Sequence, residues 1–230
     1  MLNLENTEAQ EYNKLLSLSN KMGKDKNIIQ GSGGNTSIKI KNTLFVKASG
    51  MMLEKALEKD IFIPIDLNHI YDQIQNKKNF SEDLEIKSNQ ITKLKPSIET
   101  ALHAIMPHKV VLHCHSIDAI AYSLCKELLE KLDILLKNFS WEFIKYERPG
   151  LPLANLIKRK IKEKKVDILL LANHGLIVGA DTVMNAEIIQ NKILNILKIY
   201  PRLPKSPDFK KLKKISNIIP NSKLPQHEII

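Results

Sequence analysis

Cysteines are scarce in this chain of 230 residues: Cys114 and Cys125 are the two present, and neither lies in a Cys-x-x-Cys pair. So few thiols cannot build a disulfide framework, and we expect both to be reduced. Long apolar runs are also lacking. None approaches the ~18 residues that a membrane-spanning helix needs, and the first residues are acidic and polar, unlike a signal peptide. We therefore expect a cytoplasmic protein with no membrane partner.

Arginine and aromatic residues are rare as well. The formal net charge is +10, but three of the 35 basic residues are arginine, and aromatic residues make up 5% of the chain. Nucleic-acid recognition favours arginine for bidentate contacts and aromatic rings for stacking. The charge therefore indicates a compositional bias toward lysine, and we do not expect nucleic acid as a partner. One alternative stays open, a module that binds anionic surfaces through its lysine-rich C-terminal segment.

What is present suits one globular domain followed by a tail. The composition is 43% hydrophobic and 26% charged, which is ordinary for a folded protein, and a chain of this length folds without disulfides or a structural metal. Turn residues are evenly spaced over residues 1–200, which we predict to form one domain. Residues 201–230 are rich in proline and lysine. We predict that they form a tail that is mobile or extended along a neighbouring subunit.

Hydrophobic periodicity predicts alternating helices and strands, and hence an α/β protein. The predicted helices cover residues 5–22, 97–106, 117–124, 126–136, 152–161 and 183–199. The predicted strands cover residues 38–40, 44–46, 110–115, 167–172 and 177–180. The strand at 167–172 is a continuous apolar run, which is typical of a strand buried on both faces.

Three histidines have the spacing of a metal site. His113 and His115 are separated by one residue on a predicted strand, so both imidazoles point to one face while Cys114 points to the other. Such a pair alone is also compatible with a structural role in the core. His174 lies in an Asn-His-Gly turn just after the apolar strand, where the sites of α/β proteins gather. Three neutral imidazoles that leave a fourth position open are typical of a catalytic zinc site.

Glu99 follows Pro96 in the first turn of the predicted helix 97–106, where the helix dipole favours an ionised carboxylate. Its alternative role is that of a capping carboxylate. His103 lies one turn further on the same face, and we expect it to support the site or pack in the core rather than bind a metal. No functional role is predicted for the other histidines, His69, His108 and His227.

A glycine-rich segment, Gly-Ser-Gly-Gly-Asn-Thr-Ser, occupies residues 31–37. It is not a Walker A motif, because no Gly-Lys-Ser/Thr follows, and it is not a dinucleotide fingerprint, because no strand precedes it. Alone it indicates a turn. Together with Ser49, Gly50 and Ser97, its small polar groups offer backbone amides and hydroxyls that suit a phosphate.

Four segments together resemble one known family. They are, in chain order, GGNTSIKI, VKASG, KPSIETALHAIMPHKVVLHCHS and LLANHGLIVGADT. Their order and spacing resemble the class II aldolase/adducin family, which includes fuculose- and rhamnulose-1-phosphate aldolases, over residues 8–200. The resemblance implies a three-layer α/β/α sandwich with a mostly antiparallel central sheet, assembled as a homotetramer.

The resemblance also implies roles for individual residues. His113, His115 and His174 would bind Zn²⁺ or another divalent metal, and Glu99 would be the catalytic acid/base beside it. The positions that match the family's phosphate-binding loops are Asn35, Thr36, Ser49, Gly50 and Ser97. The family often has two serines before the glutamate, whereas this chain has Ser97-Ile98, which leaves open whether the substrate is phosphorylated.

The resulting hypothesis is a zinc-dependent aldolase that cleaves a ketose 1-phosphate, or a similar sugar phosphate, to dihydroxyacetone phosphate and an aldehyde through a metal-stabilised enediolate. An epimerase, dehydratase or decarboxylase that uses the same metal site is the alternative. A non-catalytic, adducin-like protein is disfavoured because all three histidines and Glu99 are present. The family often adds a tyrosine from a neighbouring chain, and three tyrosines are suitable here: Tyr122, Tyr146 and Tyr200.

Overall fold

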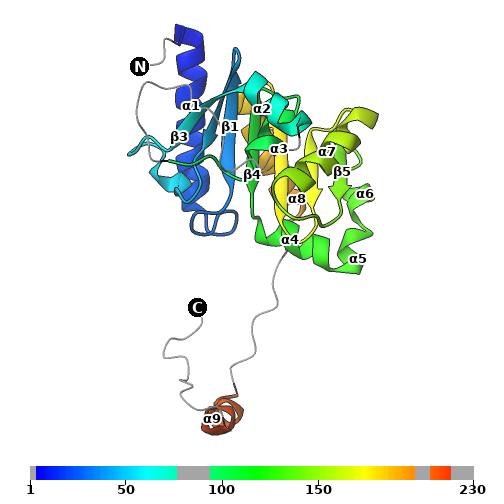
Figure 1. Ribbon diagram of the computed structural model, residues 1–230. Coiled ribbons are helices and arrows are strands. Elements are labelled where there is room, and N and C mark those ends of the chain that lie inside the picture. Colours follow the sequence, from blue (N-terminus) through cyan, green and yellow to red (C-terminus); the bar gives the residue numbers. More distant parts are fainter. Residues whose placement is uncertain (1–3, 77–93, 200–207, 219–230) are drawn as a thin grey trace. The chain divides into compact units, whose positions relative to one another are not determined.

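A computed structural model describes residues 4–76, 94–199 and 208–218 (Figure 1). The chain divides into two compact units, Met1–Lys198 and Ile199–Ile230. A seven-stranded sheet with helices on both faces makes up the first unit, and the second contains the helix α9 (Phe209–Ile218). Among the residues that the structure describes, no helix is both long and apolar enough to span a bilayer.

The strand order of the sheet is β3-β2-β1-β4-β7-β6-β5. Its strands are β1 (Asn35–Ile40), β2 (Thr43–Lys47), β3 (Phe62–Asp66), β4 (Val110–Cys114), β5 (Trp141–Ile144), β6 (Ile168–Leu171) and β7 (Gly175–Ala180). Every neighbouring pair is antiparallel except β5 and β6, which are parallel. The mostly antiparallel sheet implied by the resemblance is therefore confirmed.

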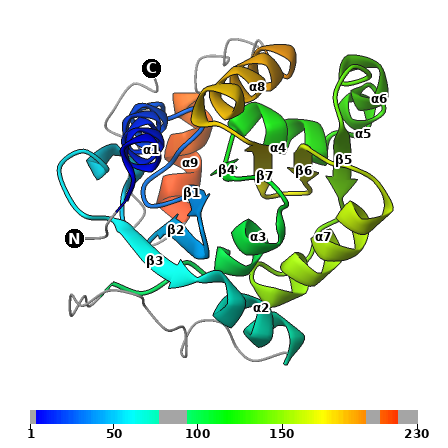
Figure 2. The same cartoon turned by 90° about the horizontal axis from the view of Figure 1, so that it is seen from above.

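Helices cover both faces of this sheet, which confirms the three-layer α/β/α sandwich (Figure 2). One layer contains α1 (Asn6–Lys24), α4 (Ile117–Leu124) and α8 (Val183–Ile196). The opposite layer contains α2 (Leu67–Gln75), α3 (Thr100–Ile105) and α7 (Leu151–Glu163). The remaining short elements are the 3₁₀ turn η1 (Leu53–Lys55) and the helices α5 (Lys126–Leu129) and α6 (Leu132–Leu135).

The pairing of β1 with β4 decides which side chains meet. Asn35 of β1 lies opposite His113 of β4, and Ser37 lies opposite Val111. Alternate residues of a strand share a face, so these four side chains point to the same side of the sheet. That side carries α3, because Ser37 Oγ lies 2.7 Å from Nδ1 of His103 on this helix.

Two clusters of buried aliphatic side chains fill the space between the sheet and the layer of α2, α3 and α7. Leu44, Ile63 and Ala101 belong to the first cluster, and Leu102 and Leu169 to the second. Burying a large aliphatic side chain stabilises a fold by about 1.5–3 kcal/mol. Since α3 contributes to both clusters, its packing fixes the start of this helix against the central strands.

Several elements are not those that the sequence predicts. Residues between Gly50 and Pro96 carry no predicted element, yet β3 and α2 form there. Pro64 lies inside β3 and argues against a central strand, but β3 is an edge strand, where the missing N–H can face solvent. The second edge strand, β5, is also unpredicted. The predicted helix 126–136 is instead the two short helices α5 and α6.

Residues 209–218 of the predicted tail form α9, so they are not extended, and the mobile alternative stays a prediction. This segment contains neither proline nor glycine, so no residue in it interrupts a helix. The five prolines of the tail all lie before or after it. The rest of the predicted tail, residues 201–207 and 219–230, lies outside the described residues.

Gly175 at the start of β7 is predicted to be the most sensitive glycine of the sheet. Its φ is 155°, and a Cβ there would overlap the carbonyl oxygen of Cys114. We expect Gly175→Ala to reduce the free energy of unfolding by about 2 kcal/mol or more, a fall in Tm of roughly 4–8 °C in thermal unfolding. Gly31→Ala is the control, because Gly31 has a φ of 56° and open space around its Cβ. Equal losses in the two variants would contradict the close approach as the cause.

Candidate active site

Three imidazoles meet at one end of β4. His113 is the second-last residue of β4, His115 follows the end of this strand, and His174 lies in the turn between β6 and β7. Because β7 pairs with β4, this turn is carried to the same end of the sheet. One ring nitrogen of each histidine lies within 4.8 Å of the others, and the Nε2 atoms of His113 and His115 are 3.1 Å apart. The structure therefore brings together the three histidines that the sequence singles out.

Two contacts fix the orientation of these rings. Nδ1 of His113 donates to the carbonyl oxygen of Leu176 at 3.2 Å, which leaves Nε2 with the free lone pair. A Cβ on Gly33 would lie 2.7 Å from Nδ1 of His115. The glycine-rich loop thus packs directly on the metal-ligand candidate His115, and a larger residue at this position would displace the ring.

Glu99 immediately precedes α3, whereas the sequence places it inside the first turn. Its side chain makes no capping hydrogen bond, so the capping alternative is wrong. The residue is 7% exposed, and its Oε1 lies 3.2 Å from Nε2 of His174 and 3.4 Å from Nε2 of His113. The other carboxylate oxygen, Oε2, accepts a hydrogen bond from Nδ2 of Asn35 at 2.6 Å.

This set of donor atoms fits a divalent cation. Nε2 of His113 carries a lone pair, and Oε1 of Glu99 has no hydrogen-bond partner among the described residues. Lone pairs at such short distances repel one another unless a proton or a metal cation lies between them. At a zinc–nitrogen distance of about 2.0–2.1 Å, tetrahedral ligand atoms are about 3.3 Å apart. The Nε2 atoms of His113 and His115, 3.1 Å apart, are close to that spacing. Oε1 of Glu99 lies beside the histidines, 3.2 Å from Nε2 of His174 and 3.4 Å from Nε2 of His113.

Burial sets the ionisation of the group. It lowers the pKa of His113, and it lowers the pKa of His115 to about 4, so both rings are neutral near pH 7. Burial by itself raises the pKa of Glu99. The positive charge that His113 and His174 carry when protonated, together with the hydrogen bonds from His174 and the amide of Asn35, outweighs burial, and the pKa lies below its usual range. Neutral imidazoles beside an ionised carboxylate are the protonation states that metal binding requires.

Three of the residues matched to phosphate binding lie near one another. Ser49 and Gly50 are exposed in the turn after β2. The bridge between Ala48 and Pro96 brings this turn beside Ser97, and the backbone N–H of Ser49 donates to the carbonyl oxygen of Lys95. The turn after β2 and Ser97 therefore form one polar region next to Glu99.

The other two residues, Asn35 and Thr36, are buried neighbours on β1 and so point to opposite faces. The hydroxyl of Thr36 lies 2.7 Å from that of Ser19 on α1, on the face of the sheet away from α3. The amide of Asn35 lies on the α3 face and contacts both Glu99 and His103. The structure therefore does not bring the Thr36 side chain together with the histidines.

Lys47 is a residue of this region that the sequence analysis missed. It is 2% exposed, and its Nζ donates to the carbonyl oxygens of Ser32 and Met51, each at 2.7 Å. These two bonds join the glycine-rich loop to the turn after β2. Both acceptors are uncharged carbonyl oxygens. Neither hydrogen bond is therefore an ion pair that offsets the cost of burying the positive charge of Lys47. The sequence pattern that could have identified Lys47 is a lysine at the end of the apolar strand Leu-Phe-Val-Lys.

The buried Lys47 leads to a prediction for stability against pH. Burial lowers its pKa to about 8, although Glu99 acts in the opposite direction. The unfolded chain, with a lysine pKa of 10.5, then binds more protons than the folded chain between about pH 8 and 10.5, so stability rises with pH in this window. Relative to Lys47→Met, the wild type should gain up to about 3 kcal/mol across it in urea unfolding. A constant difference between the two proteins would mean that the ammonium stays charged.

Two of the three candidate tyrosines are among the described residues. Tyr122 is 7% exposed and packs in the core, Tyr146 is 64% exposed, and Tyr200 lies outside the described residues. His108, for which no function is predicted, places its Nε2 2.8 Å from Oδ1 of Asp167.

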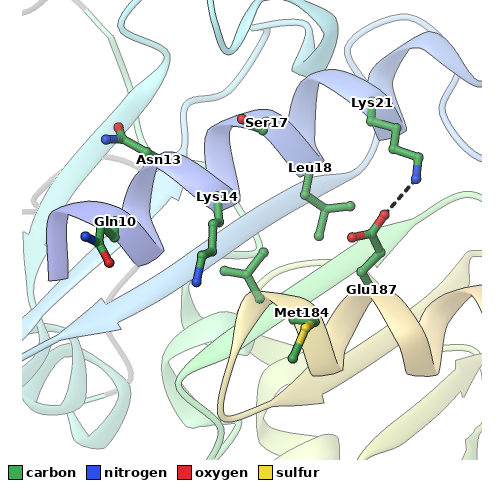
Figure 3. Close-up of a pocket in the computed structure, with 9 residues that line it drawn as sticks. Gln10, Asn13, Lys14, Ser17, Leu18, Lys21, Met184 and Glu187 are labelled. Carbon is green, nitrogen blue, oxygen red and sulfur yellow. Dashed lines mark hydrogen bonds and ion pairs between the residues drawn. The ribbon is translucent and has the colours of Figure 1, made fainter. Parts of the chain in front are cut away.

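An open groove of about 480 Å³ lies between α1 and α8 (Figure 3). An ion pair of 2.7 Å between Lys21 and Glu187 crosses it. The groove is lined by Gln10, Asn13, Lys14, Ser17, Leu18, Lys21, Val183, Met184 and Glu187. None of these is a predicted site residue, so the groove is distinct from the histidine group.

A mostly antiparallel α/β/α sandwich with three histidines and a carboxylate at one strand end defines a candidate metal-dependent enzyme. The sequence profile of the class II aldolase and adducin N-terminal domain matches residues 13–200. The chain belongs to this family, which confirms the resemblance. Membership of this family supports an enzymatic role.

The chain is similar to several individual proteins of different names. The chain is 30% identical over 203 residues to the uncharacterized oxidoreductase YuxG of Bacillus subtilis, covering 80% of this chain but 28% of that protein. It is 29% identical over 193 residues to an L-fuculose phosphate aldolase of Methanococcus maripaludis, covering 76% of this chain and 92% of the aldolase. The N-terminal class II aldolase domain of a Thermoplasma acidophilum protein has the same fold, with a TM-score of 0.67 at 24% identity over 80% of this chain and 90% of that domain.

Proposed function

We propose that this protein is a zinc-dependent aldolase that cleaves a ketose 1-phosphate, or a similar sugar phosphate, to dihydroxyacetone phosphate and an aldehyde. Its similarity to L-fuculose phosphate aldolases supports the substrate class. The main support for placing the active site at the three histidines is one group of contacts. The buried Oε1 of Glu99, which has no hydrogen-bond partner in the described part of the chain, faces Nε2 of both His113 and His174.

In this proposal His113, His115 and His174 hold the metal through one ring nitrogen each. When bound, the metal supplies a Lewis acid that polarises the substrate carbonyl and stabilises the negative charge left when the carbon–carbon bond breaks. In cleavage, the proton lost by the substrate hydroxyl that becomes the aldehyde oxygen passes through Oε1 of Glu99 to the substrate carbon next to that carbonyl. In synthesis, Glu99 removes that proton from the carbon through Oε1. Its low exposure keeps bulk water from that proton.

The phosphate group would bind where the loops converge. Ser49 and Gly50 contribute an exposed hydroxyl and backbone amides, and Ser97 contributes a hydroxyl beside Glu99. Lys47 links the glycine-rich loop to this turn, and its buried charge favours an anionic group in the neighbourhood. Ile98, which replaces a serine of the family pattern, is 50% exposed and adds no hydroxyl.

The test combines metal analysis with an activity assay on the same sample. We expect zinc near one ion per chain and release of dihydroxyacetone phosphate from a panel of ketose 1-phosphates. Zinc without release would contradict the aldolase reaction and favour epimerisation, dehydration or decarboxylation on the same site. If the protein takes up no divalent metal even when supplemented, the metal site itself is wrong and a non-catalytic, adducin-like role gains support. The homotetramer stays a prediction.

A further inference from the structure

His103 is a buried histidine that the proposed reaction does not use. It lies on α3, one turn after Glu99, and is completely buried. Its two ring nitrogens have different partners. Nδ1 lies 2.7 Å from Oγ of Ser37, and Nε2 contacts Oδ1 of Asn35.

The direction of each hydrogen bond follows from the orientation of the Asn35 amide. Its Nδ2 donates to Oε2 of Glu99, and its Oδ1 faces His103. The amide oxygen only accepts, so Nε2 of His103 carries the proton. Burial lowers the pKa of His103 to about 3, so the ring is neutral and its Nδ1 accepts from the hydroxyl of Ser37.

The four groups therefore form a chain of donors that runs in one direction, from Ser37 through His103 and Asn35 to Glu99. A reversed Asn35 amide would place its oxygen against the carboxylate and its NH₂ against the N–H of His103. Both contacts would be repulsive. The N–H of His103 thus fixes the orientation of the amide.

We propose that His103 is a positioning residue, which acts through Asn35 to anchor Oε2 of Glu99 and leave Oε1 facing His113 and His174. The part of this inference that concerns catalysis rests on the proposed function. It also gives Asn35 a role beyond the one that the resemblance implies, because its amide contacts Glu99 and His103 as well as Oγ of Ser97.

A matched pair of variants tests the proposal. His103→Leu removes the N–H at similar volume, whereas the Nε2 of glutamine in His103→Gln can still donate to Asn35. For His103→Leu we expect kcat to fall about 10- to 100-fold, with zinc content retained and KM changed less than about threefold. His103→Gln should regain most of kcat. Equal activity of the two variants would overturn the proposal, since a space-filling role makes no such distinction.

A double-mutant cycle adds a readout that packing alone would not produce. If His103 acts through Asn35, His103→Leu should have little further effect on kcat in an Asn35→Ala background. Full additivity would contradict the chain of contacts. Should His103→Leu fail to fold, Ser37→Ala serves instead, because it removes the donor that fixes the tautomer of His103. This variant should lower kcat several-fold with zinc retained, and wild-type kcat would count against the proposal.

A crystal structure of His103→Leu, or of Ser37→Ala if the first does not fold, separates this proposal from the proposed function. The expected result is an Asn35 amide or a Glu99 carboxylate that is rotated from its wild-type position. An unmoved carboxylate would overturn positioning by His103 even in an active aldolase. If no ketose 1-phosphate is cleaved, the proposed function fails, and a rotated carboxylate would still support the positioning role.

Discussion

The variant Glu99→Gln is expected to keep its bound zinc and to lose turnover by about a thousandfold, within the range that general acid–base catalysis contributes. Glutamine has the shape of glutamate, and its amide oxygen can still accept the hydrogen bond from Asn35. The group facing His113 and His174 becomes an NH₂, which can neither take up nor return a proton at neutral pH. The three histidines are unchanged, so metal binding remains.

The measurement is kcat for release of dihydroxyacetone phosphate at saturating substrate, with zinc analysed in the same preparation. Glu130→Gln is a suitable control, because Glu130 is exposed between α5 and α6 and should be neutral in both measurements. Wild-type turnover in Glu99→Gln would remove the carboxylate from the chemistry. Loss of zinc together with turnover would instead identify Glu99 as a metal ligand.

The second large effect is expected for His113→Ala, which should lose most of its zinc and its activity. Removing one of three imidazoles leaves an incomplete ligand set and lowers metal affinity by about 100-fold or more. Zinc binds the folded state, so a saturating excess of about 100 times Kd should raise the Tm of the wild type by roughly 5–10 °C. The same addition should leave the Tm of His113→Ala nearly unchanged.

Cys114→Ala provides the matched control. Cys114 is next to His113 and equally buried, but its side chain faces Gln190 on the opposite side of the sheet. The variant should therefore bind zinc like the wild type and show the same zinc-dependent rise in Tm. Stoichiometric zinc in His113→Ala would exclude this histidine from the ligand set. Zinc loss in Cys114→Ala would contradict the register of β4.

Local sequence patterns were sufficient to predict that His113, His115 and His174 lie together. The alternation of a strand places His113 and His115 on one face, and the Asn-His-Gly turn places His174 at a strand end, without knowledge of the sheet order. The central helices and strands were predictable for a similar reason, since their apolar periodicity reports the burial of one or both faces. The end of a helix is less certain, and Glu99 accordingly lies just before α3 rather than inside it.

What could not be predicted depends on contacts between distant segments. The hydrogen bonds of Asn35 exist because β1 pairs with β4 and α3 packs over both, which no local pattern encodes. The burial of Lys47 likewise depends on where two loops meet. The opposite orientation of Thr36 was predictable, because Asn35 and Thr36 are adjacent residues of one strand and cannot share a face.

If the protein is the proposed zinc enzyme, the strand order also determines when the folding chain can bind its metal. The neighbours of β4 are β1, from the beginning of the domain, and β7, from near its end. Forming such non-local pairs requires closing long loops, which makes them slow steps of folding. His113 and His115 can capture zinc weakly in an unfolded chain, but His174 joins them only after β7 has docked on β4. The rate of tight zinc uptake during refolding therefore reports the closure of the central sheet.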